Sequence, residues 1–523
     1  MTFLNCIQVA KRTIMTLLSL SIMKAVADEK NGASTQANNT VRIEQGQASG
    51  ISYDEVTAFL GIPYAKPPVG ELRWRAPQDP EPWDSLHHAN AFGDACAQFG
   101  NFYTSNDAAS FDRPYGSEDC LHLNVWAPKR SAMPRPVIVF IHGGSGVHGA
   151  TLLPLYNGQR LAKELNAVFV SINYRLGFFG NLSLAALQTG DPAHDSGNFA
   201  LLDQIKALEW VQKNIPSFGG DASNVTVMGH SAGCTSIWSL MRSPLASGKF
   251  HKSICLSGLP QESSKEELTE TNNKLLANLL VADGTIASKD ELKNYLNTTN
   301  PTQLKNYLYS KSAIDISSAS QGTGGIAIAV DGHVITVGKS GPLVNAVPTL
   351  IGTTQNEAPL LLLKKFSQKN YSAIWEMIHT DKPLKQSDFF GGLSDFWKFK
   401  VSAWVTNKML LSMVQDAVPL LTQQSVPVYQ YKFNWQKTPE PWRALFGAYH
   451  GIDVPFIFGN FGLGTKNFTH FTWRVSEEAE RENIHTELRK AIQGFIETTD
   501  PNKYTANAEW PLWNETKQVK IIQ

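Results

Sequence analysis

Residues 225–233, VTVMGHSAG, place a serine between two glycines at the end of an apolar run. The spacing G-x-S-x-G is typical of a serine on a sharp strand-to-helix turn, with its hydroxyl exposed for nucleophilic attack. A strand pattern over residues 225–228 enters the turn, and apolar residues three or four apart after it favour a helix. The alternative is a polar residue in an ordinary tight turn. We expect Ser231 to be a nucleophile if the sequence also supplies its partners.

A serine nucleophile needs hydrogen-bond donors for the oxyanion of its tetrahedral intermediate. The apolar run VIVFI ends in His142-Gly143-Gly144-Ser145, at the C-terminal end of a predicted strand, where ligands bind in open α/β sheets. The backbone N–H groups of Gly144 and Ser145, with that of Ala232, are therefore the expected oxyanion hole. The alternative is a glycine turn that only joins a strand to a loop.

The nucleophile also needs an acid and a histidine base. In a fold of this kind both follow the serine along the chain, the acid first and the histidine second. Glu357 follows a short apolar run in VPTLIGTTQNEAP, and His450 lies in the glycine-flanked stretch GAYHGIDVPFIFG. A solvated loop carboxylate and a core histidine are the alternatives. His142, His148 and His230 are nearer to Ser231 in sequence, but they belong to the turns that must supply N–H groups.

The elements that must position these residues form an α/β pattern. From about residue 41, short alternating runs predict a small N-terminal β subsheet. Compact apolar runs then alternate with segments of helical spacing, which predicts a largely parallel sheet covered by helices on both faces. The clearest helix follows Asn198 and ends near Ile215. Residues 262–345 predict a helical insertion, and residues 41–523 are expected to form a single domain.

The N-terminal residues resemble a secretory signal. Lys11 and Arg12 precede an apolar stretch, and AVA at residues 25–27 is a small-residue cleavage pattern. We interpret residues 1–27 as a signal peptide and residues 28–40 as a flexible segment, so the mature protein is expected to be soluble and secreted. An uncleaved membrane anchor is the alternative, but the apolar stretch is short against the ~20 residues of a membrane span.

Charge and cysteine content restrict the partners and the compartment. Lys and Arg together number 46, as do Asp and Glu, so neither nucleic acid nor an anionic membrane is an expected partner. Beyond the signal, an even number of cysteines in an oxidising compartment allows pairing. We expect Cys234 and Cys255 to be buried free thiols, although the sequence leaves their pairing open. N-x-S/T sequons fit glycosylation in a eukaryotic host, but Asn224, beside a predicted core strand, is expected to stay unmodified.

The chain from about residue 41 to 500 resembles the type-B carboxylesterase and cholinesterase family. The resemblance rests on FLGIPYAKPPVGELRWRAP, EDCLHLNVWAP, GNFALLDQIKALEWVQKNIPSFGGD, VTVMGHSAG, IGTTQNEAP and GAYHGIDVPFIFG, in the family's order. It implies an α/β-hydrolase fold in which Ser231 is the nucleophile, Glu357 the acid and His450 the base. It also implies a disulfide between Cys96 and Cys120, and Ser257 as a hydrogen-bond partner of the acid.

Several positions depart from the family's pattern. Ser145 stands where a third glycine is usual, and Gly146 where a bulky aromatic residue is common. His230 replaces a glutamate beside the nucleophile, which removes a negative charge that would favour cationic substrates. Cys234 replaces a small glycine. The stretch between Cys96 and Cys120 lacks the tryptophan with which cholinesterases hold a quaternary ammonium, so choline esters are not the expected substrates.

The expected activity is hydrolysis of a small-molecule carboxylic ester through an acyl-enzyme on Ser231, with a fall in kcat/KM below about pH 6 to 7 as the base protonates. No phosphate-binding loop and no H-E-x-x-H zinc pair is found, so neither a cofactor nor a metal is expected. Two alternatives remain: a non-catalytic binding module of the same family, and a lipase acting on aggregated lipid. Oligomeric state is left open.

Overall fold

The computed structural model describes residues 39–129, 133–323, 328–462, 466–505 and 510–523. The expected signal peptide at 1–27, and the flexible segment at 28–40 apart from its last two residues, lie outside the described residues. Arg42–Gln523 forms one compact unit.

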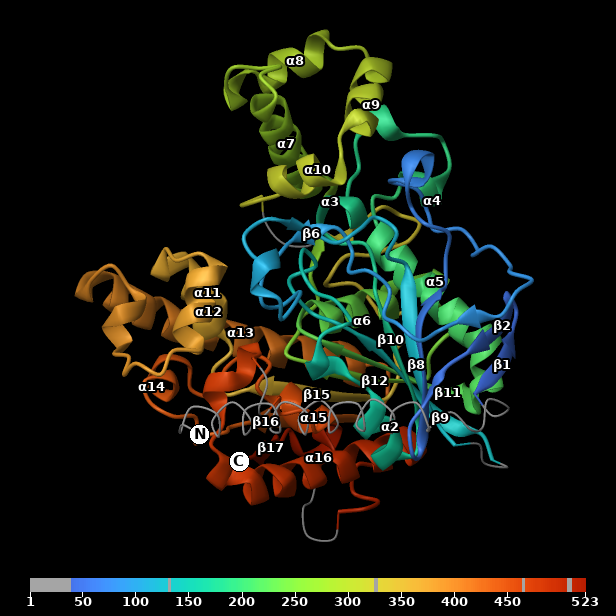
Figure 1. Ribbon diagram of the computed structural model, residues 1–523, viewed down its shortest axis with the longest axis vertical. Coiled ribbons are helices and arrows are strands. Elements are labelled where there is room, and N and C mark those ends of the chain that lie inside the picture. The colour runs from blue at the N-terminus through green and yellow to red at the C-terminus, as the bar shows by residue number, and fades with distance from the viewer. Residues whose placement is uncertain (1–38, 130–132, 324–327, 463–465, 506–509) are drawn as a thin grey trace, which may run out of the picture. The chain divides into compact units, whose positions relative to one another are not determined.

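A ten-stranded sheet runs through this unit (Figure 1). Seven adjacent strands pair in parallel, and each of the three strands at one edge pairs antiparallel with its neighbours. In spatial order the strands are β17 (Lys520–Ile522), β16 (Val428–Phe433), β15 (Thr349–Thr354), β12 (Lys252–Leu256), β11 (Gly220–His230), β9 (Arg135–Ile141), β10 (Val168–Ile172), β8 (His122–Pro128), β4 (Val56–Pro63) and β3 (Ile51–Ser52). The largely parallel sheet predicted from the apolar runs is therefore present.

The central strands are buried because helices cover both faces of the sheet. Every residue of β10 and β12 is buried, as a parallel sheet with two covered faces requires. Helix α2 (Gln159–Leu165) packs with α16 (Glu478–Thr498), and α5 (Phe199–Asn214) packs with α6 (Ala232–Arg242). Figure 1 shows the two pairs on opposite sides of the strands. The helix predicted after Asn198 is α5, which ends where a 3₁₀ turn at Ile215–Phe218 begins.

Two groups of helices extend from the sheet (Figure 1). The predicted insertion contains α7 (Lys265–Ala282), α8 (Leu292–Thr298), α9 (Pro301–Ser310) and α10 (Ala313–Ala319). A second group follows β15 and contains α11 (Ala358–Ser367), α12 (Tyr371–Ile378) and α13 (Leu393–Thr422). The shorter elements are β1 (Thr40–Ile43), β2 (Gly46–Ser49), β5 (His87–His88), β6 (Gln98–Phe99), β7 (Pro114–Tyr115), β13 (Glu262–Ser263), β14 (Ile328–Ala329), α3 (Gly177–Gly180), α4 (Pro192–Asp195), α14 (Trp442–Phe446), α15 (Asp453–Phe458) and α17 (Trp513–Thr516).

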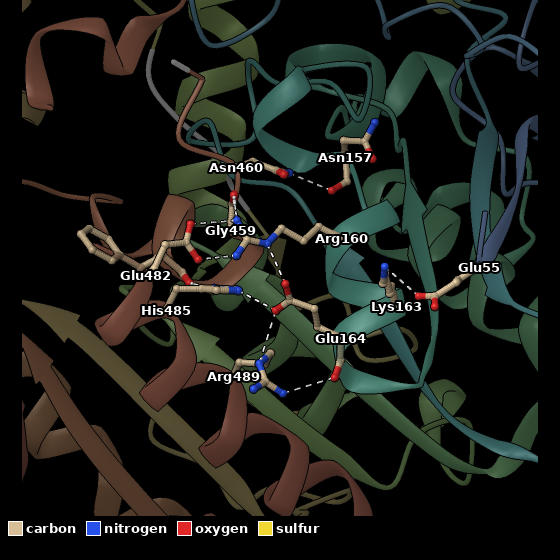
Figure 2. Close-up of polar contacts among 11 residues, drawn as sticks. Glu55, Asn157, Arg160, Lys163, Glu164, Gly459, Asn460, Glu482, His485 and Arg489 are labelled. Carbon is tan, nitrogen blue, oxygen red and sulfur yellow. Dashed lines mark hydrogen bonds and ion pairs between the residues drawn. The ribbon is translucent and has the colours of Figure 1, made fainter. Parts of the chain in front are cut away.

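An ion-pair network joins α2 to α16 (Figure 2). The Glu164 carboxylate accepts a hydrogen bond from Arg160 Nε at 2.8 Å and lies 2.7 Å from His485 Nε2. Arg489 Nε pairs with the same carboxylate at 3.3 Å, and Arg160 also pairs with Glu482 at 2.5 Å. Partial burial acts to raise the pKa of Glu164, but the bonds from His485 and Arg160 outweigh it and lower the pKa to about 2. The network therefore stabilises the docking of the two helices while Glu164 is ionised.

Disulfides join two pairs of cysteines. Cys96 and Cys120 are bonded, with their Cα atoms 4.9 Å apart. Cys234 and Cys255 are also bonded, with their Cα atoms 4.8 Å apart, so the expectation of free thiols there is wrong. In the sequence, each of these two cysteines lies in an apolar run, with no other cysteine nearby. The crossover from α6 to β12 brings them together, because the first turn of α6 lies against that strand.

Candidate active site

Ser231 occupies the sharp turn between β11 and α6. Its backbone has φ 56° and ψ −120°, a left-handed conformation that is strained for a residue with a side chain. The Ser231 N–H donates to Leu256 O at 2.7 Å, which anchors the turn to β12. A Cβ at Gly229 would lie 2.4 Å from the backbone of Gly233, and one at Gly233 would lie 2.0 Å from Ile141 O. Both glycines are therefore required by the close approach of the strands and the helix.

A glycine turn with unused backbone donors lies against the nucleophile. A Cβ at Gly143 would be 2.9 Å from Ser231 Cβ, so the turn after β9 touches the serine. Gly144 and Ser145 follow with φ 108° and 54°, and their N–H groups have no acceptor among the described residues. Ala232 begins α6, so its N–H also lacks an intrahelical partner. This is a donor set that an oxyanion can use.

Glu357 and His450 lie in contact at the C-terminal end of the sheet. Glu357 Oε2 is 2.5 Å from His450 Nδ1. Its other oxygen accepts hydrogen bonds from Ser257 Oγ at 2.8 Å and from Thr354 N at 2.6 Å. Because Ser257 and Thr354 fix one carboxylate oxygen, the other oxygen is positioned to orient the imidazole. His450 Nε2 is buried and has no hydrogen-bond partner among the described residues.

Two hydrogen bonds, one of them to a side chain, join the two loops that carry Glu357 and His450. Asn356 N donates to Ala448 O at 3.0 Å, and Ala448 N donates to Asn356 Oδ1 at 3.0 Å. Gly451 follows His450 with φ 84°, and a Cβ there would lie 2.8 Å from the His230 ring. The histidine loop can therefore pack this closely only with glycine at that position.

His230 lies beside the base. Its ring centroid is 4.8 Å from that of His450. Burial lowers the pKa of His230 well below 6.5, and the nearby His450 lowers it further. His230 is therefore neutral near pH 7, and it places no formal charge beside His450.

Asp453 is a buried acid near the pair that the sequence analysis did not single out. It is fully buried and accepts a hydrogen bond from Tyr431 OH at 2.7 Å. Burial raises the pKa of Asp453 to about 6. The only signal in the sequence is an acidic residue three positions after His450 in a run that is otherwise apolar.

Two cavities meet at Ser231. One has a volume of about 240 Å³ and is lined by Ser231, Ala232 and His450 together with apolar residues of α11 and α13. The other has a volume of about 500 Å³ and is lined by Gly144, Ser145, Ser231 and His450, by aromatic side chains and by residues from α10 to α12. An ester bound at Ser231 therefore has space on both sides of its carbonyl.

The sequence analysis missed most of the cavity lining. Ser317 and Ser320 reach the larger cavity from the insertion, and Lys364 and Tyr371 reach it from the segment after the acid. None of these residues lies in a motif, so only spatial proximity identifies them. Among the described residues there is no group of His, Cys, Asp and Glu that could hold a metal ion, and no helix long and apolar enough to span a membrane.

The Carboxylesterase family model matches residues 37–523. The chain belongs to this family. It is 32% identical over 496 residues to para-nitrobenzyl esterase of Bacillus subtilis, covering 92% of this chain and 94% of that protein. It is 32% identical over 500 residues to human cocaine esterase, covering 88% and 83% of the two chains.

Solved carboxylesterase structures have the same fold. A PNB esterase superposes with a TM-score of 0.72 at 30% identity, covering 93% of this chain and 96% of the other. A carboxylesterase of Geobacillus stearothermophilus superposes with a TM-score of 0.70 at 28% identity, covering 92% and 96%. The family resemblance and the expected α/β-hydrolase fold are therefore confirmed. The protein is an enzyme that hydrolyses carboxylic esters.

Proposed function

We propose that Ser231, Glu357 and His450 are the catalytic triad of this carboxylesterase. Ser231 Oγ attacks the ester carbonyl while His450 Nε2 takes its proton, and the alcohol leaves with that proton. Water then hydrolyses the acyl-enzyme by the same route. Glu357 stays ionised, orients the imidazole and stabilises the imidazolium. The contact of 2.5 Å between Glu357 and His450 Nδ1 carries this proposal, because it occupies Nδ1 and leaves Nε2 without a partner among the described residues, on a residue that lines the same two cavities as Ser231.

The N–H groups of Gly144, Ser145 and Ala232 form the proposed oxyanion hole. Their lack of acceptors and their position beside Ser231 support this role. Each such donor contributes about 10² to 10³ in rate, and general base catalysis about 10² to 10⁴. The family fold and these groups account for ester hydrolysis without any further cofactor in the proposed steps.

The substrate is proposed to be other than a choline ester. The stretch between Cys96 and Cys120 contains no tryptophan, and the larger cavity has no carboxylate among its described lining residues. A quaternary ammonium would therefore find neither a tryptophan face from that stretch nor a carboxylate. Secretion is proposed as well. The charged and apolar pattern of residues 1–27 and the two disulfides support an oxidising compartment.

Hydrolysis of 4-nitrophenyl esters from C2 to C12 tests the proposed triad, with Ser231→Ala measured in parallel. We expect the wild type to turn over and the variant to lose at least about 10³-fold in kcat while melting at the same temperature. Labelling by an organophosphonate at Ser231, located by peptide mass, is the independent readout. A folded Ser231→Ala variant that retains activity removes Ser231 from the mechanism. A wild type that neither turns over nor is labelled favours the binding-module alternative.

A lipase acting on aggregated lipid is a second candidate, and the surface of α13 favours it. Large apolar side chains recur along one face of this helix and are exposed to solvent: Leu393, Trp397, Val401, Trp404, Val405, Met409 and Met413. Trp397 and Trp404 are 62% and 61% exposed. Leu410 and Val414 of the same helix line the smaller cavity, so α13 carries both exposed apolar side chains and part of the wall beside the nucleophile. An apolar face beside a cavity opening is suited to contact with a lipid surface.

Tributyrin separates the two candidates, because it can be offered below and above its solubility limit. A lipase of this kind increases its rate when droplets form, and Trp397→Ser with Trp404→Ser abolishes that increase while dissolved 4-nitrophenyl butyrate is still hydrolysed. Val475→Ser, at an exposed apolar residue outside α13, is the matched control. A wild-type rate that saturates at the solubility limit supports the esterase alone.

A further inference from the structure

The larger cavity carries a single formal charge, and that charge is positive. Among its described lining residues there is no aspartate or glutamate, and Lys364 of α11 is its only lysine or arginine. Three histidines also line it. Burial lowers the pKa of His148 to about 4 and that of His230 well below 6.5, so both are neutral near pH 7. The third, His450, must be neutral to act as the base.

The Lys364 ammonium forms no ion pair with any carboxylate of the described residues. Its Nζ lies 3.5 Å from the centroid of the Tyr371 ring. Burial lowers the pKa of Lys364, and the charge of Asp112 acts against that change. The ordinary pKa of a lysine lies near 10.4, well above neutral pH, so the proposed role takes the Lys364 side chain as an ammonium.

Asp112, the acid whose charge acts on Lys364, is engaged elsewhere. Its carboxylate accepts hydrogen bonds from Tyr371 N at 3.0 Å, from Ser372 N at 2.9 Å and from Ser372 Oγ at 2.7 Å. The Asp112 carboxylate therefore binds the first two residues of α12 and forms no hydrogen bond with Lys364 among the described residues. The carboxylate also does not line the cavity. The ammonium therefore remains available to a ligand.

The smaller cavity offers no comparable group. Its one charged lining residue is Glu357, which is bonded to His450, Ser257 and Thr354 N. The rest of the lining consists of small, polar or aliphatic residues, among them Leu361, Leu410 and Val414. The two sides of the nucleophile therefore differ in charge. The smaller cavity has only the engaged Glu357 carboxylate, whereas the described lining of the larger cavity has a lysine and no carboxylate.

We propose that the larger cavity selects esters that carry a carboxylate on the part remote from the scissile bond, and that Lys364 binds this carboxylate. The inference rests on the proposed ester hydrolysis at Ser231 and adds the class of substrate. An anionic group entering this cavity meets one cation and no opposing carboxylate on the walls described here. A cationic group meets like charge and no partner, so it is disfavoured.

The expected preference is moderate because Lys364 is exposed to solvent. An ion pair at such a site is worth about three- to five-fold in kcat/KM, and salt screens it. The preference should therefore decrease between low and high ionic strength. An effect of shape or hydrophobicity alone would not respond to salt in this way.

Matched ester pairs test the proposal. In the first pair, 4-nitrophenyl hydrogen adipate and 4-nitrophenyl methyl adipate differ in a charge on the acyl side. In the second pair, 4-acetoxybenzoate and methyl 4-acetoxybenzoate differ in a charge on the alcohol side. The measured quantity is the ratio of kcat/KM for the anionic ester to that for its neutral partner. Lys364→Met is compared with Lys365→Met, which removes the same charge from the next residue of α11, outside the cavity.

We expect Lys364→Met to lower the ratio by about three- to five-fold for at least one pair, and Lys365→Met to leave it within two-fold of the wild type. The pair that responds shows which side of the ester occupies the larger cavity. If Lys364→Met changes neither ratio by more than two-fold while both variants melt like the wild type, the proposal is wrong. If the proposed function itself is wrong, the result is different: Ser231→Ala hydrolyses the esters of both pairs as fast as the wild type, or neither protein hydrolyses them.

Discussion

His230 and His450 face each other with their ring centroids 4.8 Å apart, and the buried Nε2 atoms of both rings lack hydrogen-bond partners among the described residues. His230 is neutral near pH 7 because burial lowers its pKa well below 6.5. The base of the proposed triad therefore has one carboxyl group in direct contact, Glu357, and a neutral ring beside it. The residue beside the nucleophile is thus one of the groups that set the charge around the imidazolium, together with Glu357 and the nearby Asp453.

Replacing His230 with Glu should raise the lower midpoint of the kcat/KM profile by about one pH unit. A negative charge beside His450 stabilises the imidazolium, so the base becomes neutral only at higher pH and activity is lost earlier on acidification. The profile is measured with a neutral ester from pH 5 to 9. His230→Gln adds no charge, and its midpoint should match that of the wild type. A His230→Glu profile that coincides with His230→Gln contradicts the electrostatic role of this position.

Replacing Ser257 with Ala should lower kcat by about ten-fold with little change in KM. Ser257 Oγ donates to Glu357 Oε1 at 2.8 Å, and a hydrogen bond to a charged group is worth about 1.5–3 kcal/mol. Thr354 N still holds the same oxygen at 2.6 Å, so the acid is loosened rather than lost. Ser223→Ala removes a hydroxyl that donates to Asp221 at the start of β11, and it serves as the control. Equal kcat in the two variants would exclude a positioning role for Ser257.

Replacing Gly233 with Ala should destabilise the protein by about 3 kcal/mol or more, at the upper end of the range for overpacked sites. The new Cβ would lie 2.0 Å from Ile141 O, a backbone atom that cannot move without shifting β9. Gly392→Ala is the control, because its added Cβ meets nothing within 4 Å and its φ of 167° is open to any residue. Urea unfolding of both variants provides the measurement. A Gly233→Ala protein as stable as Gly392→Ala is incompatible with the close approach of α6 to β9.

Replacing Glu164 with Gln should lower the free energy of unfolding by about 1–2 kcal/mol at pH 7, after allowance for solvent screening. The pKa of Glu164 lies at about 2 in the folded protein against 4.5 ordinarily. Its ionisation therefore stabilises the fold fully above about pH 4.5, and this contribution is lost as the pH falls toward 2. The difference between wild type and variant should shrink between pH 7 and pH 3 in urea titrations. Glu55→Gln, which removes an exposed partner of Lys163, should show a smaller and pH-insensitive change; a Glu164→Gln difference that is constant with pH would falsify the assignment.

The sheet and the nucleophilic turn were predictable because their signals are local. The runs that became β9, β10, β11 and β12 are continuous in sequence, and burial on both faces leaves an unbroken apolar pattern. The glycines around Ser231 are also a local signal, since the turn needs them within a few residues. The boundaries of α5 were predicted to within one residue at each end for the same reason.

By itself, the sequence determined the succession of strand and helix segments along the chain and the turn at Ser231. It also determined the membership of a family whose motifs are contiguous. Only the tertiary structure decided which distant residues meet. Glu357 and His450 are 93 positions apart, and their contact depends on adjacent loops at one end of the sheet. The sequence likewise did not predict the bond between Cys234 and Cys255 or the position of Lys364 in the cavity wall. The physical reason is that spacing along the chain encodes local conformation, whereas contacts between separate elements depend on how whole helices and strands pack.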